Sequence, residues 1–219
     1  MADNRIAYGL AKKYGIDTTG MSPAEVWKAL EEKGVAKRSE PEVAEDDGSA
    51  KFNKTSPSKF ELKMTEAKDT IPEKERWRVD VHTEEDYNRD KLFTTPGGSC
   101  VAIESNGNII SVCKHKDDIV KGRDLLRHAI KNGGDRLDAF SGLYGFYLKQ
   151  GFKPISWTPF DERYAPAGWN KERDRAEPII FWQYTGEVEK TRYEDFIKNV
   201  KPSKDYDTAM RIRDEVMKK

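Results

Sequence analysis

The stretch that most constrains the fold is residues 97–115, where two runs rich in β-forming residues flank the pair Asn106-Gly107. An Asn-Gly pair favours the type I′ turn of a two-residue β-hairpin, because both residues tolerate positive φ. With Asn106 and Gly107 as the two turn residues, the residues that lie opposite each other on the two strands are Ile103 and Ile110, Val101 and Val112, and Cys100 and Cys113. We expect the four aliphatic side chains to share one face, since a one-residue slip would separate each pair.

The two cysteines of the chain therefore face each other across the predicted hairpin. Two thiols without a Cys/His partner set cannot close a zinc shell, so we expect neighbouring reduced thiols and no metal site. The N-terminal residues lack the apolar stretch of an export signal, which together with free thiols predicts a cytoplasmic setting. No run of ~18 apolar residues is present, so we expect no membrane span.

Charge is balanced, with 39 Lys and Arg against 39 Asp and Glu, and charged residues make up 36% of the chain. A net charge of zero gives the whole chain no attraction to nucleic acid or anionic lipid, so any such binding would have to be local.

Helices and strands alternate after the hairpin. Helical spacing predicts a helix with Ile119 on its apolar face, ended by the glycines at 133 and 134. The elements predicted next are a strand at 136–140, a helix that stops at Gly151, and strands at 153–160 and 177–184. A strand–helix–strand crossover after an antiparallel hairpin predicts an α/β fold, of the α+β mixed-sheet type, with helices packed on it.

Further elements are predicted on both sides of this region. Residues 77–81 alternate apolar and polar side chains and predict a strand, and Thr83 can cap the short helix that follows. Amphipathic segments at 193–200 and 206–216 predict two C-terminal helices.

The first 35 residues predict a helix, an extended loop and a second helix. Ile6, Leu10 and Tyr14 form one apolar stripe, and Ser22 stands at the cap of a second helix that ends at Gly34. Residues 36–58 hold few apolar side chains and predict a flexible linker. The predicted division is a helical module at 1–35, the linker at 36–58, a main domain at 59–186 and C-terminal helices at 187–219.

The helical module resembles SAP-like modules, which often bind DNA. The resemblance rests on Leu10, the Tyr14-Gly15-Ile16 run, Gly20 and the helix that starts at Ser22. Basic residues of the module could meet phosphates, but nearby acidic residues nearly cancel their charge. A small docking or oligomerisation module, with a protein partner, is the alternative interpretation.

The main domain is similar to the GNAT superfamily of N-acetyltransferases. Residues 147–152, Tyr-Leu-Lys-Gln-Gly-Phe, match that family's Tyr-x-Lys-x-Gly-Phe corner, and residues 77–184 follow its order of elements. The style of the sequence is close to GNAT-like domains encoded by bacteriophages and prophages. The resemblance implies acetyl-CoA as a substrate and Tyr147 as the acid that protonates the departing thiolate. It also implies that backbone N–H groups around residues 112–114 polarise the thioester carbonyl.

The turn that binds pyrophosphate in that family departs from the family pattern. The family motif at this turn is Gln/Arg-x-x-Gly-x-Gly/Ala. In this chain Asp117 stands at the Gln/Arg position, Val120 at the first Gly and Gly122 at the last position, so only Gly122 matches. Basic residues surround the turn and could supply charge. The residues we predict to bind the cofactor are Val112, Lys114, Lys121, Gly122, Arg123 and Ser141.

An acetyltransferase also needs a base for the acceptor amine. Glu104, near the tip of the hairpin, is the first candidate, and Asp80 and His115 are others. Two functions remain open on this basis. The chain is either a GNAT-type acyltransferase with an unidentified amine acceptor, or a non-catalytic GNAT-like phage structural or host-interaction protein. The second would be cytoplasmic or virion-associated if a phage encodes it.

Overall fold

A computed structural model of the chain describes residues 11, 12, 14–21, 23–33, 51–188 and 190–218. It divides into two compact units, Met1–Asp47 and Gly48–Lys219. In the first unit, α2 (Pro23–Glu32) buries Val26 and Leu30, in agreement with the predicted second helix. The predicted apolar positions 6 and 10, the Ser22 cap and the Gly34 stop lie outside the described residues.

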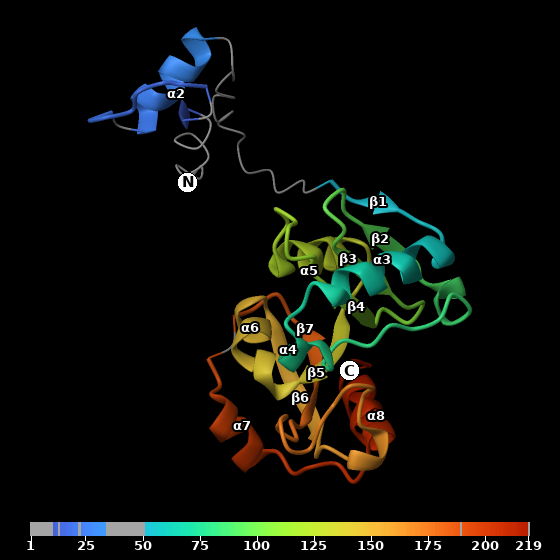
Figure 1. Ribbon diagram of the computed structural model, residues 1–219. Coiled ribbons are helices and arrows are strands. Elements are labelled where there is room, and N and C mark those ends of the chain that lie inside the picture. The colour runs from blue at the N-terminus through green and yellow to red at the C-terminus, as the bar shows by residue number, and fades with distance from the viewer. Residues whose placement is uncertain (1–10, 13, 22, 34–50, 189, 219) are drawn as a thin grey trace. The chain divides into compact units, whose positions relative to one another are not determined.

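The second unit contains two antiparallel sheets (Figure 1). Sheet A has the order β1 (Asn53–Lys54), β2 (Lys91–Thr94), β3 (Cys100–Ile103) and β4 (Ile109–Cys113). Sheet B has the order β5 (Arg136–Phe140), β7 (Ile179–Tyr184) and β6 (Phe152–Thr158). The predicted single mixed sheet is therefore wrong, because β4 and β5 run parallel but share one isolated bridge, Asn108 with Arg136.

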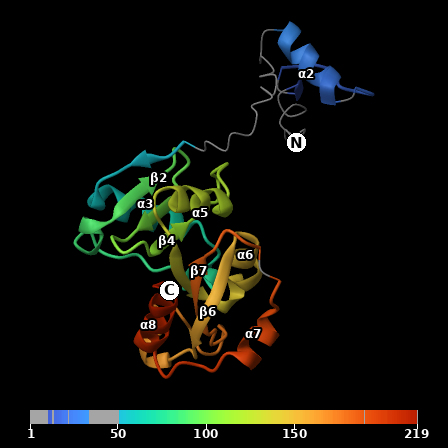
Figure 2. The same ribbon diagram turned by 180° about the vertical axis from the view of Figure 1, so that it is seen from behind.

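Helices cover both faces of each sheet. On sheet A, α3 (Pro57–Asp69) packs on the face of Leu92 and Ala102, and α5 (Gly122–Lys131) packs on the face of Val101 and Ile103. On sheet B, α6 (Tyr144–Lys149) and α7 (Tyr193–Asn199) lie on one side, and α8 (Tyr206–Val216) lies on the other (Figure 2). The remaining helical segments are α4 (Glu73–Arg76), η1 (Asp86–Arg89), η2 (Ser141–Leu143) and η3 (Glu162–Tyr164).

The second unit begins earlier than predicted. Phe52, before β1, stacks on the ring of His128 with centroids 3.8 Å apart, and α3 starts at Pro57. Residues 51–58 are thus part of the folded unit, and the predicted linker at 36–58 is wrong for this portion. The C-terminal helices also belong to the unit, since Phe196 of α7 and Ala209 of α8 are buried.

The predicted strand at 77–81 does not form. Trp77 instead ends α4 and packs edge-on against Phe140, with ring centroids 4.9 Å apart. Arg78 pairs with Glu177 at 2.6 Å. Residues 77–81 are therefore held by side-chain contacts and not by the backbone hydrogen bonds of a sheet. The predicted cap at Thr83 is wrong, because η1 begins at Asp86 and Glu85 takes its cap position. The Thr83 N–H donates to Asp86 Oδ2 at 3.0 Å, and Thr83 Oγ1 accepts from the Asp86 N–H at 3.4 Å.

The hairpin forms in a different register near its tip. Ile103 pairs with Ile109 and Ala102 with Ile110, because the turn is a three-residue loop in which Gly107 has φ of 89°. Ile110 therefore faces α3, and the prediction that it shares a face with Ile103 is wrong. A bulge at Ser111, which has φ of 52°, then shifts the register by one. The predicted opposition of Cys100 and Cys113 is confirmed for this reason.

Both thiols are buried and free. Burial, reinforced by the neighbouring thiol, raises the pKa of Cys100 to about 12, and burial raises the pKa of Cys113 to about 11. These cysteines are therefore unreactive core side chains at neutral pH.

The helix α6 ends before Gly151, as predicted. The backbone of Gly151 is in a conformation that favours glycine, which can be tested by substitution. Gly151 has φ of 84°, and a Cβ there would lie 3.1 Å from the backbone of Gly186. We expect Gly151→Ala to lower the free energy of unfolding by ~1–3 kcal/mol, measured by urea denaturation. Gly145 in α6 is the matched control, because a Cβ there meets nothing within 4 Å. Gly145→Ala should raise stability by ~0.5 kcal/mol, and an equal loss in both variants would contradict the strain.

Candidate functional site

A cleft of about 1450 Å³ opens where β4 and β5 diverge. The two strands meet at the bridge between Asn108 and Arg136, and beyond it each pairs within its own sheet. The cleft is lined by residues 109–112 of β4 and residues 137–140 of β5. Its other walls come from residues 78–90, the loop at 158–166 and the start of α8.

Tyr147 lines this cleft from α6. Its side chain is 6% exposed and packs between Phe152 and Trp182, with ring centroids 6.0 and 5.5 Å away. The hydroxyl has no hydrogen-bond partner among the described residues. Burial, and then the negative charge of Asp138, raises the pKa of Tyr147 above its usual value. The phenol is therefore a protonated donor that lines the cleft and has no acceptor in the described part of the chain.

Asp138, on β5, lines the same cleft and was missed by the sequence analysis. Its pKa is raised by burial, against a hydrogen bond from Tyr206 and the charge of Arg213, which both lower it. A carboxyl group with a raised pKa in a cleft is a candidate general base. The available signal was a single carboxylate in the middle of a short apolar strand, Arg-Leu-Asp-Ala-Phe.

The bulge in β4 also lies on the cleft. Ser111 has positive φ, and its Oγ lies 2.8 Å from the hydroxyl of Tyr87, which accepts a hydrogen bond from the His82 N–H at 3.2 Å. A bulge interrupts the regular ladder and directs backbone groups away from it. Strained residues of this kind persist where the surrounding structure fixes them, and they cluster at ligand sites.

In the turn before α5, backbone N–H groups donate hydrogen bonds to two carboxylates of the same segment, Asp118 and Asp124. Asp118 accepts hydrogen bonds from the Val120 N–H at 3.0 Å, from the Ser99 N–H at 3.2 Å and from the Thr95 hydroxyl. Asp124 accepts from the Lys121 N–H at 3.0 Å. Because these carboxylates already use backbone donors that a pyrophosphate would need, this turn fits a phosphate group poorly. The same turn leaves Ile119 94% exposed, so its predicted place on the apolar helix face is wrong.

The predicted site residues divide between the cleft and other places. Tyr147, Glu104 and Val112 line the cleft, together with Asp80. The predicted cofactor residues Lys114, Lys121, Gly122 and Arg123 lie on or before the N-terminus of α5, away from its lining. Ser141 lines a separate, smaller pocket, and its N–H donates to the Pro178 carbonyl at 2.9 Å. His115 accepts a hydrogen bond from the Asp117 N–H and lies against Gly98.

Charge in the cleft is strongly negative. Three cationic side chains line it, Arg78, Arg163 and Lys204. The carboxylates that line it are Asp80, Asp86, Asp90, Glu104, Asp138, Asp161, Glu162, Asp205 and Asp207. Some of them are engaged within the protein, as Asp161 is with Arg163 at 2.6 Å. The remainder give the cleft a field that attracts cations.

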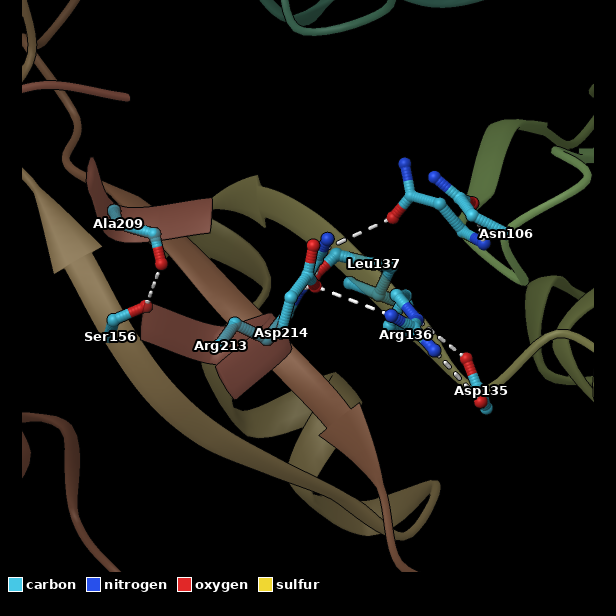
Figure 3. A network of polar contacts seen from close by, with 9 residues as sticks. Asn106, Asp135, Arg136, Leu137, Ser156, Ala209, Arg213 and Asp214 are labelled. Atoms are coloured by element: carbon cyan, nitrogen blue, oxygen red, sulfur yellow. Dashed lines mark hydrogen bonds and ion pairs between the residues drawn. The ribbon is translucent and has the colours of Figure 1, made fainter. Parts of the chain in front are cut away.

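Arg213, on α8, contacts two residues that line the cleft. It is 1% exposed, and its guanidinium donates to Asn108 Oδ1 and to the Leu137 carbonyl, each at 3.2 Å. Figure 3 shows Arg213 with its neighbour Asp214, which also pairs with Arg136 at 3.3 Å. The buried guanidinium of Arg213 thus contacts both strands at the point where they separate, through Asn108 next to β4 and through Leu137 of β5.

Comparison with known proteins gives no assignment. No protein-family model matches the chain, and no curated protein or solved structure is significantly similar to it. Among the described residues, no group of His, Cys, Asp and Glu is arranged to hold a metal ion. No helix in the described part of the chain is long and apolar enough to cross a membrane.

Proposed function

We propose that the second unit is a GNAT-type acyltransferase that moves an acetyl group from acetyl-CoA to an amine. The observation that carries this proposal is the divergence of β4 from β5 beside the unpartnered hydroxyl of Tyr147. Such a gap lets the thioester arm pass between two strands, with its carbonyl beside the β4 bulge and its sulfur beside the phenol.

The chain's own groups have distinct roles in this reaction. Asp138, or Glu104 through water, accepts a proton from the acceptor ammonium, and the free amine then attacks the thioester carbon. The C–N bond forms as the C–S bond breaks, and backbone N–H groups at the Ser111 bulge stabilise the negative charge on the carbonyl oxygen. Tyr147 gives its proton to the thiolate and regains one from solvent. A phenol held protonated by burial suits this step.

Ligand binding by the full chain tests the proposal. Acetyl-CoA at about 100 times its dissociation constant should stabilise the fold by ~2.7 kcal/mol, or roughly 5–10 °C in Tm. Ala139→Phe, which fills the cleft from β5, should abolish this shift while leaving the circular dichroism spectrum unchanged. Ala167→Phe, at an exposed position that does not line the cleft, is the matched control. No shift of the unmodified chain at millimolar acetyl-CoA would contradict acetyl-CoA as the acyl donor.

A second candidate is a non-catalytic cleft that does not bind CoA. The observation that favours it is the carboxylate of Asp118 in the turn before α5, where a pyrophosphate would otherwise bind. S-acetyl-N-acetylcysteamine, a thioester without the pyrophosphate, separates the two. Transfer from this compound but not from acetyl-CoA would keep the acyl chemistry and reject CoA as the donor. Transfer from neither would favour the non-catalytic function.

A further inference from the structure

We propose that a second site, beside α6, binds the phosphate monoester group of a small molecule that has an apolar body. The site is a pocket of about 490 Å³ between η2 and α6 on one side and residues 190–194, which lead into α7, on the other. This pocket shares no lining residue with the cleft between β4 and β5 in the described part of the chain. The inference therefore goes beyond the proposed acyltransferase and does not depend on it.

The first observation is that two lysines line this pocket without an acidic partner. Lys149, at the end of α6, and Lys190 make no ion pair within 4.0 Å among the described residues. Arg192 also lines the pocket, but it pairs at 3.8 Å with Glu194, the one carboxylate among the described lining residues. Three cations thus face one carboxylate. The like charges repel one another, and a bound anion would relieve that repulsion.

The second observation is a glycine in the wall of the pocket. Gly145 lies inside α6, where alanine would favour the helix more than glycine does. Neither backbone conformation nor packing requires glycine here, because its φ is not positive and a Cβ would meet nothing within 4 Å. A residue that breaks a local preference without such a reason is expected at functional sites. The missing side chain leaves space for a ligand against the backbone of α6.

The other lining residues favour an anion with an apolar body. The hydroxyls of Ser141 and Thr191 can donate hydrogen bonds to the oxygens of an anion. Leu148, Tyr144 and Tyr193 provide an apolar wall, in which the two tyrosine rings have centroids 5.4 Å apart. The volume of the pocket is in the range of small-molecule sites.

The two unpaired lysines favour a phosphate monoester over a carboxylate. A phosphate monoester carries nearly two negative charges at pH 7 and three acceptor oxygens. A carboxylate carries one charge, so that one of the two lysines would remain without a partner. The ligand class that matches the lining is therefore a dianionic head on an apolar body.

Isothermal titration of the full chain with phenyl phosphate tests the proposal. We expect phenyl phosphate to bind at least fivefold more tightly than benzoate, which has the same ring but a single charge. It should also bind at least fivefold more tightly than inorganic phosphate, which has no apolar body. Equal affinity for either of these probes would overturn the ligand class, and no binding of phenyl phosphate at millimolar concentration would overturn the site.

Charge-neutral variants locate the site. Lys149→Gln should weaken phenyl phosphate binding by about fivefold. Lys198→Gln, which makes the same change in α7, is the matched control, because Lys198 is exposed and does not line the pocket. Equal losses in both variants would mean non-specific attraction to surface charge and would overturn the site.

Gly145→Ala separates binding from folding. The added methyl group would occupy part of the pocket, so phenyl phosphate binding should weaken several-fold. The same substitution should make the fold more stable, because alanine is the better helix former. A loss of affinity in a stabilised variant cannot come from unfolding. Unchanged affinity would mean that no ligand lies against α6 and would overturn the proposal.

The Ala139→Phe variant tells this site from the cleft. Ala139 lines the cleft and not the pocket beside α6, so the variant should bind phenyl phosphate as the unmodified chain does. Loss of binding in this variant would place the ligand in the cleft and would overturn the second site. Acetyl transfer is measured separately, and its absence leaves the phosphate monoester site intact.

Discussion

Tyr147→Phe is expected to lower kcat for acetyl transfer by about 100-fold or more while leaving KM for acetyl-CoA nearly unchanged. The reason is that the hydroxyl has no hydrogen-bond partner among the residues that the structure describes, and in the proposed reaction it acts only when the thiolate departs. Steady-state kinetics that follow release of the CoA thiol measure both constants. A rise in KM with unchanged kcat would mean that the hydroxyl binds the ground state and is not the acid.

Stability separates a chemical role of Tyr147 from a structural one. Because no hydrogen bond is lost, Tyr147→Phe should change the free energy of unfolding by less than ~0.5 kcal/mol. Tyr184→Phe is the matched control, since Tyr184 also packs on Phe152, with ring centroids 5.3 Å apart, and does not line the cleft. Equal losses of kcat in both variants would contradict the role of Tyr147 as proton donor.

The sequence predicted most elements around this site because their signals are local. Glycine after a short aromatic helix predicted the end of α6, and the apolar runs after it predicted β6 and β7. The hairpin was predicted for the same reason, but its register was not. Asn-Gly favours a two-residue turn in isolation, whereas the folded hairpin combines a three-residue loop with the bulge at Ser111.

The parts that the sequence did not predict depend on contacts between distant segments. Alternation at 77–81 has the period of a strand, but Trp77 packs on Phe140 and Arg78 pairs with Glu177, so the segment has no strand partner. Nothing local indicates that β4 and β5 separate after one bridge. The importance of Asp138 was missed for the same reason, because its position becomes special only when the neighbouring strand moves away.

Arg213 in the C-terminal helix α8 makes another contact between distant segments. Removing this side chain is the second change for which we expect a large effect, a loss of stability. Arg213→Met should lower the free energy of unfolding by ~3–5 kcal/mol, because it removes one member of a buried charged network. The groups left behind include the Leu137 carbonyl, Asn108 Oδ1 and the carboxylate of Asp214. Urea denaturation measures this loss. Arg211→Met is the matched control, since its pair with Glu215 at 2.7 Å is exposed and should cost ~0.5 kcal/mol or less.

The pH dependence of the Arg213→Met variant identifies the carboxylate that Arg213 supports. Arg213 lowers the pKa of Asp138, so its removal should raise that pKa further above the unfolded value. An acid whose pKa is higher in the folded state binds more protons there, and stability is lost as pH rises through the window between the two pKa values. The deficit of the variant should therefore be larger at pH 7 than at pH 4. A deficit that is the same at both pH values would mean that Arg213 stabilises the fold through packing and neutral hydrogen bonds, with no influence on the acid of the cleft.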